Sequence, residues 1–225
     1  MATLLGAGIS TVTAFIVLNL GQRADRKKRA EERLAIEASH AISGFIKLTQ
    51  WTNLLANIKQ HIDRFYHEAQ QDGLQTTEAC LIVGPSAGQF TEPEKLKAEE
   101  FAFLAMEKES DLLGSVQLLE ARAQNTNHVL NDYSRLRMEF EIWLESLPGF
   151  QRKLDGRLTE DRFPAEHKGN WDIRVAQLNV LIGELIGQID DEINFAEQTV
   201  NRFSEVARRR FGDRFPKISF DMKPV

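Results

Sequence analysis

Glutamate and histidine three residues apart on a helix form a metal-binding pattern, and Glu37 and His40 have this spacing. In di-iron helical bundles, two Glu-x-x-His motifs and two further glutamates project into the core and hold the metal. The sequence contains no second Glu-x-x-His motif. We therefore interpret Glu37 and His40 as part of a solvated helix face. A metal-dependent enzyme with a hidden site at these two residues is kept as an alternative.

The other residues with chemical potential form no recognisable catalytic, metal or phosphate site. His61 and His67 are six residues apart, so they do not share a helix face. The glycine-containing stretch 84–88 lacks the Lys-Ser/Thr of a phosphate-binding loop. Arg208–Arg210 and Arg214 form a basic patch near the end of a predicted helix, where positive charge favours the helix dipole. An anionic partner is the alternative explanation of that patch. We expect no catalytic residue, no cofactor, no metal and no small-molecule substrate.

Composition limits the class of protein and its partners. The chain has 225 residues and a net charge of −5. This balance suits a solvated helical surface and gives no reason to expect nucleic acid as a partner. Cys80 is the only cysteine, which excludes an intrachain disulfide and a cage of thiolate metal ligands.

The N-terminal residues 1–22 contain no ionisable side chain. Roughly 20 helical residues cross a hydrocarbon core about 30 Å thick, so the segment is just long enough to span a bilayer. A cleaved signal peptide is less consistent, because no basic residue precedes the apolar stretch. A buried soluble helix would be less uniformly uncharged. We predict a single-pass transmembrane anchor at residues 1–22 and a soluble domain at residues 23–225.

Basic residues follow the predicted anchor directly, and none precedes it. Because Lys and Arg near a membrane span stay on the cytoplasmic side, we expect the N-terminus outside and the C-terminal bundle in the cytoplasm. The same side chains are expected to face anionic headgroups of the membrane lipid. This headgroup-facing cluster consists of Arg23, Arg26, Lys27, Lys28 and Arg29.

A strip of small residues recurs every four positions in the predicted anchor, at Ala2, Gly6, Ser10 and Ala14. Such strips allow helices to approach closely in membranes, which predicts a homo-oligomer formed through the anchor. Small residues are also common in membrane spans that do not associate. Both interpretations are kept.

Apolar residues repeat every three or four positions along most of the domain, as is typical of long amphipathic helices. The expected fold is all-α, with the transmembrane helix continuing into an elongated, coiled-coil-like antiparallel bundle of three helices. The bounds follow from the stripes and from Gly and Pro between them. The predicted helices are 23–71, 93–147 and 170–211, the connections are 73–92 and 148–169, and the tail is 212–225.

This topology predicts where the two connections lie. If the first helix leaves the bilayer, the second returns to it. The connection at 148–169 would then lie near the membrane, and the connection at 73–92 would lie at the far end. Within the latter, residues 79–83 are expected to form a short strand or a docking segment. Gly183 and Gly187 predict a close helix crossing.

These features favour a non-enzymatic, membrane-anchored helical scaffold or assembly protein, either self-associating or bound to a protein partner. The first alternative is an accessory or sensory subunit of a larger membrane complex, contacted through the far connection or the tail. The second is a phage-encoded structural or lysis-associated membrane protein. Apolar residues alternate in the tail, which is expected to dock on the bundle or to contact a partner through Phe215, Ile218 and Phe220.

Overall fold

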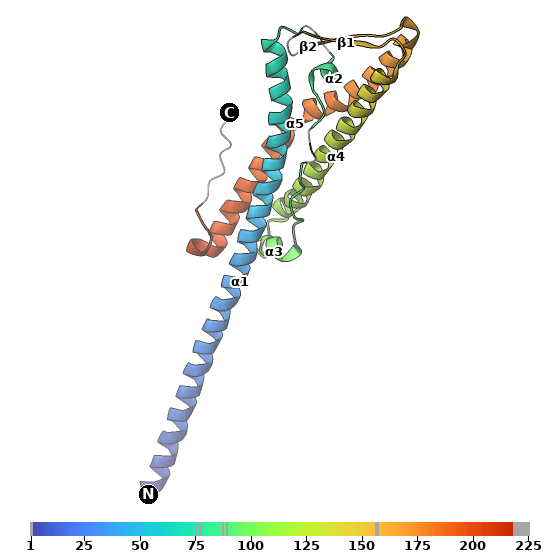
Figure 1. Ribbon diagram of the computed structural model, residues 1–225. Coiled ribbons are helices and arrows are strands. Elements are labelled where there is room, and N and C mark those ends of the chain that lie inside the picture. The colour runs from blue at the N-terminus through green and yellow to red at the C-terminus, as the bar shows by residue number, and fades with distance from the viewer. Residues whose placement is uncertain are drawn as a thin grey trace.

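Five α-helices and one β-hairpin make up the described part of the chain (Figure 1). The described residues are mostly helical, which confirms the predicted all-α class, but the β-hairpin was not predicted. The computed structural model describes residues 2–74, 76, 78–86, 88, 90–155 and 158–217, without the side chains of 2–21, 24 and 154–160.

Helix α1, Ala2–Gln71, is a single helix of 70 residues. At about 1.5 Å per residue it is about 105 Å long. It ends in a glycine turn, because Gly73 has a φ of +70° and its N–H donates to the Gln70 carbonyl at 3.2 Å. The next N–H, from Leu74, donates to the Ala69 carbonyl at 3.0 Å. A left-handed glycine satisfies the last carbonyls of a helix in this way. The predicted helix end at residue 71 is confirmed.

After α1 the chain reverses direction through a short helix and a long segment whose described residues form no helix or strand. Helix α2, Ala79–Ile82, docks on the bundle with Cys80 buried, as a helical turn rather than a strand. We call residues 83–97 the return segment. Its start lies against Phe65 of α1, since a Cβ on Gly84 would meet that ring at 2.8 Å. The return segment runs back along α1 from the level of Phe65 to that of Gly44, roughly 32 Å along the helix axis. An extended chain rises up to about 3.3 Å per residue, so the segment is long enough to cover this distance.

The predicted second helix at 93–147 is wrong at its start. Helix α3, Ala98–Met106, begins five residues later. The Glu100 carboxylate accepts the Lys97 N–H at 2.8 Å and thereby fixes the first turn of α3. Side chains of α1 and α4 bind backbone groups just before this turn, which stabilises an extended conformation there.

A second break separates α3 from helix α4, Ser110–Ser146. Lys108 lies at this break with a φ of +60°, a left-handed conformation that costs about 1 kcal/mol or more. Beside it, Glu109 pairs with Arg202 at 2.8 Å and with Arg209 at 2.7 Å, both from the last helix. These contacts hold the break against that helix. No Gly or Pro marks the break in the sequence.

The second connection contains a β-hairpin. Strand β1, Gln151–Asp155, pairs antiparallel with strand β2, Leu158–Arg162. A 3-10 turn, Ala165–His167, leads into helix α5, Lys168–Phe211. The predicted third helix at 170–211 is confirmed to within two residues.

Helices α1 and α4 run in the same direction, and α5 runs against both (Figure 1). Near the start of the bundle, Glu37 of α1 pairs with Arg210 of α5 at 3.2 Å. Further along, Lys59 pairs with Asp190 at 3.0 Å. In the ion pairs between α4 and α5, residue numbers rise along one helix as they fall along the other, so these two helices are antiparallel as well. The second long helix, α4, does not run back toward the N-terminal end of α1, so that prediction is wrong. The return segment leads the chain back instead. The connection at 148–169 consequently lies at the end of α1, which we call the distal end.

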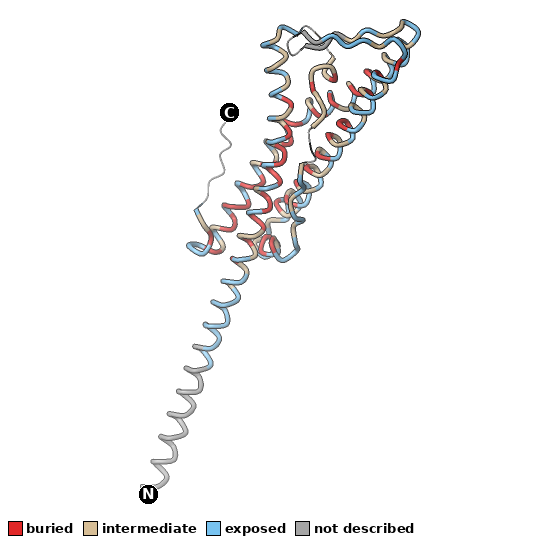
Figure 2. The backbone as a smooth tube through the Cα atoms, in the orientation of Figure 1, coloured by how far each residue is buried: buried red, intermediate tan, exposed pale blue. Residues whose placement is uncertain are grey.

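The apolar stripes of α1, α4 and α5 are buried against one another, as their spacing predicts (Figure 2). Two polar side chains are buried within these stripes. Asn127 fills a gap in the α4 stripe, and Glu192 is buried within the α5 stripe. Gly183 and Gly187 face open space, since a Cβ on either would meet no atom within 4 Å. The predicted close crossing at these glycines is therefore wrong.

A buried ion pair fastens the return segment to α1. Lys47 Nζ lies 2.9 Å from Glu100 Oε1, and their side chains are 8% and 5% exposed. Ser43 Oγ also donates to Glu100 at 2.7 Å. The two segments approach closely here, because a Cβ on Gly44 would lie 3.0 Å from both Cβ and the carbonyl oxygen of Glu100. Gly44 thus allows α3 to seat directly on α1.

We predict that Glu100→Gln lowers the free energy of unfolding by roughly 2 kcal/mol at pH 7, the usual size for a hydrogen bond to a charged group. Burial raises the pKa of Glu100, but hydrogen bonds from Lys97 N–H, Lys47 and Ser43 bring it below the ordinary 4.5. The contribution is therefore complete above pH 4.5 and is lost as the pH falls through the lower folded-state pKa. Urea titrations from pH 3 to 8 measure this dependence.

The matched control is Glu99→Gln, which removes an exposed charge from the same helical turn. Exposed substitutions usually change stability by about 0.5 kcal/mol or less. Equal losses in the two variants at pH 7 would contradict the role of the Lys47–Glu100 pair. So would a difference that does not shrink at low pH.

Candidate functional site

A cavity of about 650 Å³ lies at the distal end, where five segments distant in sequence meet. Its walls come from the last turns of α1, from α2, from the C-terminal part of α4, from the hairpin and from the start of α5. Aromatic and aliphatic side chains form its apolar surface. These are Phe65, Leu81, Ile82, Phe140, Leu144, Phe163 and Trp171.

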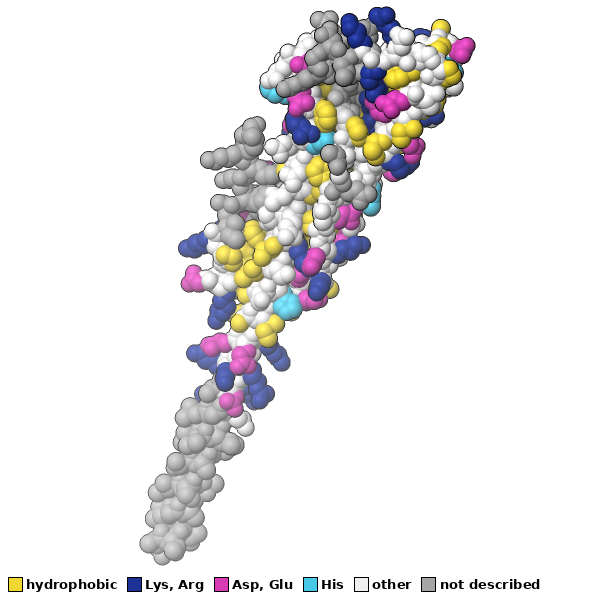
Figure 3. Space-filling model, in the orientation of Figure 1, with side chains coloured by type: hydrophobic (Ala, Val, Ile, Leu, Met, Phe, Trp, Pro, Cys, Tyr) yellow, Lys and Arg dark blue, Asp and Glu magenta, His cyan; other side chains and the backbone are white. Residues whose placement is uncertain are grey.

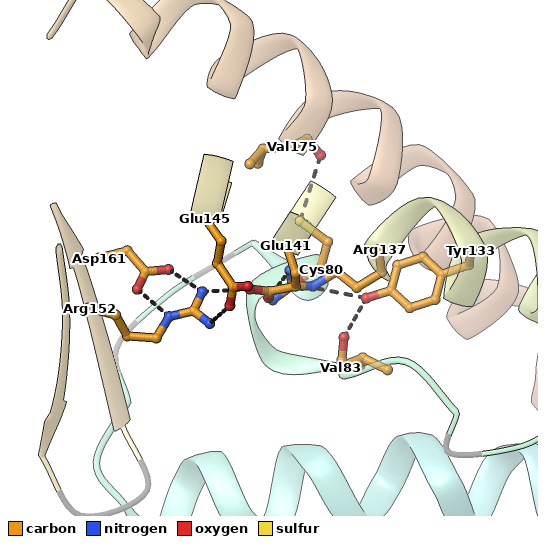
Figure 4. A network of polar contacts seen from close by, with 9 residues as sticks. All are labelled: Cys80, Val83, Tyr133, Arg137, Glu141, Glu145, Arg152, Asp161 and Val175. Carbon is orange, nitrogen blue, oxygen red and sulfur yellow. Dashed lines mark hydrogen bonds and ion pairs between the residues drawn. The ribbon is translucent and has the colours of Figure 1, made fainter. Parts of the chain in front are cut away.

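Arg152 of β1 joins the hairpin to α4 through three carboxylates (Figure 4). Its Nε lies 2.8 Å from Asp161 Oδ1 on the paired strand. Its Nη2 lies 2.6 Å from Glu141 and its Nη1 lies 3.0 Å from Glu145, both on α4. The hydrogen bond to Asp161 makes the largest contribution to raising the pKa of this guanidinium above its ordinary value. The cluster fixes one wall of the cavity.

A second cluster connects α4 to α2 behind this wall (Figure 4). Arg137 Nε donates to the Cys80 carbonyl at 3.1 Å, and its guanidinium pairs with Glu141. The fully buried Tyr133 donates its hydroxyl to the Val83 carbonyl. Burial raises the pKa of Tyr133 well above the ordinary value, so the phenol stays protonated. These bonds attach α2 and the start of the return segment to α4.

Cys80 is a structural residue in this arrangement. Its Sγ is buried and donates to the Val175 carbonyl at 3.7 Å, and its N–H donates to Asn179 at 2.9 Å. Burial raises the pKa of the thiol to about 11. Because the thiolate is the reactive form of cysteine, this side chain is inert at neutral pH.

The cavity carries an excess of negative charge. The described residues that line it include five carboxylates and two guanidinium groups, which give a formal charge of −3. Three of these carboxylates are held by the two arginines, as described above. Glu68 and Asp72, one turn apart at the end of α1, make no ion pair within the described part of the chain. The site therefore suits a ligand with a positive charge and an apolar body. Among the described residues that line the cavity there is no serine, cysteine or histidine.

The predicted membrane residues lie away from this cavity, at the opposite end of α1. Ala2, Gly6, Ser10 and Ala14 are in the helix, but their side chains lie outside the described residues. Over the part that was described, no helix is both long and apolar enough to cross a membrane. The headgroup-facing cluster is entirely exposed; it comprises Arg23, Arg26, Lys27, Lys28 and Arg29.

The predicted tail residues divide into two groups. Phe215 is 1% exposed and packs edge-on against Phe45 of α1, with ring centroids 5.7 Å apart. It therefore docks on the bundle, and its side chain is not available to a partner. Ile218 and Phe220 lie outside the described residues.

Two other sequence candidates serve structural contacts. Glu37 of the Glu-x-x-His motif pairs with Arg210, and no metal-binding cluster of His, Cys, Asp and Glu occurs among the described residues. Arg210 also pairs with Glu107 at 3.1 Å. The basic patch at the end of α5 thus joins α5 to α1 and to the turn after α3.

Sequence reasoning missed the distal cavity. A signal was present on α4, where Arg137, Glu141 and Glu145 follow one another at four-residue spacing and so share a helix face. Their partner Arg152 lies in a stretch without helical periodicity. Only the strand register, which sets Arg152 opposite Asp161, brings the cluster together.

Comparison with known proteins adds no relative. No protein-family model matches the sequence, and neither curated proteins nor solved structures include a significantly similar one. The function is therefore argued from the geometry and charge of this chain.

We predict that Tyr133→Phe lowers the free energy of unfolding by about 1–3 kcal/mol, because the buried Val83 carbonyl loses its donor. The matched control is Tyr66→Phe. Tyr66 is 37% exposed, so losing its hydroxyl is expected to change stability by less than about 0.5 kcal/mol. Urea titrations of both variants measure the difference. Equal stability of the two would contradict the proposed contact between α4 and the return segment.

Proposed function

We propose that this protein is a non-enzymatic, membrane-anchored helical scaffold that presents its distal cavity to a protein partner. One observation carries the proposal. Helix α1 begins at residue 2 and has no break, and among its described side chains from residue 22 onward the first buried one is Ala38, so the helix leaves the bundle with its surface exposed toward the N-terminus (Figure 2).

The projecting part has the composition of a membrane anchor. Residues 1–22 contain no ionisable side chain and are rich in Leu, Ile, Val and Phe. Helices in proteins gain most of their stability from packing of their apolar face, so an apolar helix needs apolar surroundings. A hydrocarbon core of about 30 Å supplies the missing apolar surroundings over about 20 residues.

The exposed basic cluster supports a cytoplasmic bundle. Its five Lys and Arg side chains lie directly after the uncharged residues and are all solvent-exposed. Basic residues in that position favour the cytoplasmic side of a single membrane span. The 49 residues from 23 to 71 then carry the distal end about 73 Å from the hydrocarbon core.

The distal cavity is the feature most suited to a partner. Its aromatic surface and its formal charge of −3 fit an inserted basic side chain, such as lysine or arginine on another protein. This observation also favours the narrower alternative of an accessory subunit in a larger membrane complex. Self-association through Ala2, Gly6, Ser10 and Ala14 remains a prediction.

The test compares the full chain with a truncated chain that starts at Arg23. Both are mixed with neutral phosphatidylcholine vesicles and separated by flotation, and both are analysed by light scattering in detergent. We expect the full chain to float and the truncated chain to stay in solution, because only the full chain has the apolar segment. Recovery of the full chain without vesicles would contradict the anchor. A monomeric full chain would contradict self-association and leave the distal cavity as the site for a different partner.

A further inference from the structure

The start of the bundle contains a second hollow, opposite in charge to the distal cavity. It is a shallow groove of about 410 Å³ between α1 and the last turn of α5. Ala30 and Leu34 form its apolar part. Its charged residues are Arg26, Arg29, Arg33, Glu37 and Arg210, a formal charge of +3.

The positive charge of the groove is neutralised at one end only. Arg210 reaches across from α5 and is held by Glu37 at 3.2 Å and by Glu107 at 3.1 Å. These contacts lie at the end nearest the bundle, and Glu37 is the only carboxylate among the described residues that line the groove. The other three arginines make no ion pair within the described part of the chain. They leave uncompensated positive charge toward the N-terminal end.

The three free arginines share one helix face. Arg26, Arg29 and Arg33 follow at intervals of three and four residues, which places them above one another on α1. All three are exposed. Long side chains on a helix lean toward its N-terminus. On α1 this direction leads toward the uncharged residues 1–22, and charged side chains surround the helix just beyond them (Figure 3).

We propose that this groove binds the headgroup of an anionic phospholipid from the membrane that holds residues 1–22. The inference rests on the proposed anchor and extends it to a defined lipid class. Guanidinium groups bind phosphate through paired hydrogen bonds, and the apolar floor at Ala30 and Leu34 accommodates the glycerol part of the lipid.

The height of the groove favours a lipid over a soluble anion. Arg26 lies four residues beyond Gln22, about 6 Å along the helix axis, and Arg33 lies about 16 Å beyond it. The polar layer of a bilayer extends roughly 5–7 Å beyond the hydrocarbon core on each side. Arg26 therefore lies at phosphate level, and the side chains of Arg29 and Arg33 lean toward that level.

The test measures lipid binding to the full chain in a neutral detergent. Phosphatidylglycerol is titrated in, and bound lipids are counted by native mass spectrometry. The groove variant is R29Q/R33Q, and the control is K27Q/K28Q, which removes the same charge from other faces of α1 and slightly closer to the uncharged residues. Glutamine preserves the helix, which circular dichroism verifies.

We expect phosphatidylglycerol to bind the groove variant about 25-fold more weakly than it binds the unmodified chain. This corresponds to roughly fivefold for each guanidinium–phosphate contact that the variant loses. The control variant is expected to lose less than about fivefold. Equal losses in the two variants would overturn the groove in favour of a diffuse surface potential. Unchanged binding in both would overturn any lipid site on this helix.

Two further arms separate the source of the anion from the anchor. Soluble glycerol phosphate is expected not to displace the lipid at equal concentration, and displacement would overturn the assignment to a membrane lipid. Flotation on neutral phosphatidylcholine vesicles tests the anchor without any anionic lipid. A chain that floats but shows no preference for phosphatidylglycerol disproves the groove alone. A chain that does not float disproves the anchor, and the inference falls with it.

Discussion

The topology of this molecule depends on how the return segment is fastened to α1. Lys47 and Glu100 meet at 2.9 Å in a nearly dry contact, and Gly44 provides the space for it. Two charges removed from water are stable only when they are paired and further hydrogen-bonded, and Ser43 and the Lys97 N–H supply those bonds. With α3 seated here, α4 has to start at the same end of the bundle as α1. Every later element follows from that starting point.

The parallel course of α1 and α4 determines what gathers at each end. The hairpin leaves α4 at the distal end, beside the last turns of α1, and there it completes the cavity with its formal charge of −3. Helix α5 then runs the full length back and delivers Arg210 to the groove with its formal charge of +3. The net charge of −5 is therefore unevenly distributed, and the hollows at the two ends of the bundle have opposite charge. Such separation suits two different partners, one at each end.

The sequence predicts those parts of the fold that depend on local pattern. The stripe of α1, its stop at Gly73 and the bounds of α5 all follow from apolar spacing and from a left-handed glycine. The break at Lys108 could not be predicted, because ion pairs with α5 stabilise it and no breaker residue marks it. The extended start of the predicted second helix depends likewise on side chains from α1 and α4. The distal cavity has the same cause, since five separate segments supply its lining.

Helix α1 also links the two ends mechanically. From residue 22 to residue 43 the sequence contains neither glycine nor proline, so the part between the uncharged segment and the bundle has no weak point. Each residue of a helix turns the next by about 100°. The number of residues between the uncharged segment and the bundle therefore determines how the bundle, with its distal cavity, is rotated about the helix axis relative to that segment. The face that carries Arg26, Arg29 and Arg33 is the same face on which the end of α5 packs, as their shared groove with Arg210 demonstrates. A single continuous helix thus fixes both the distance and the rotation of the bundle relative to the uncharged N-terminal residues.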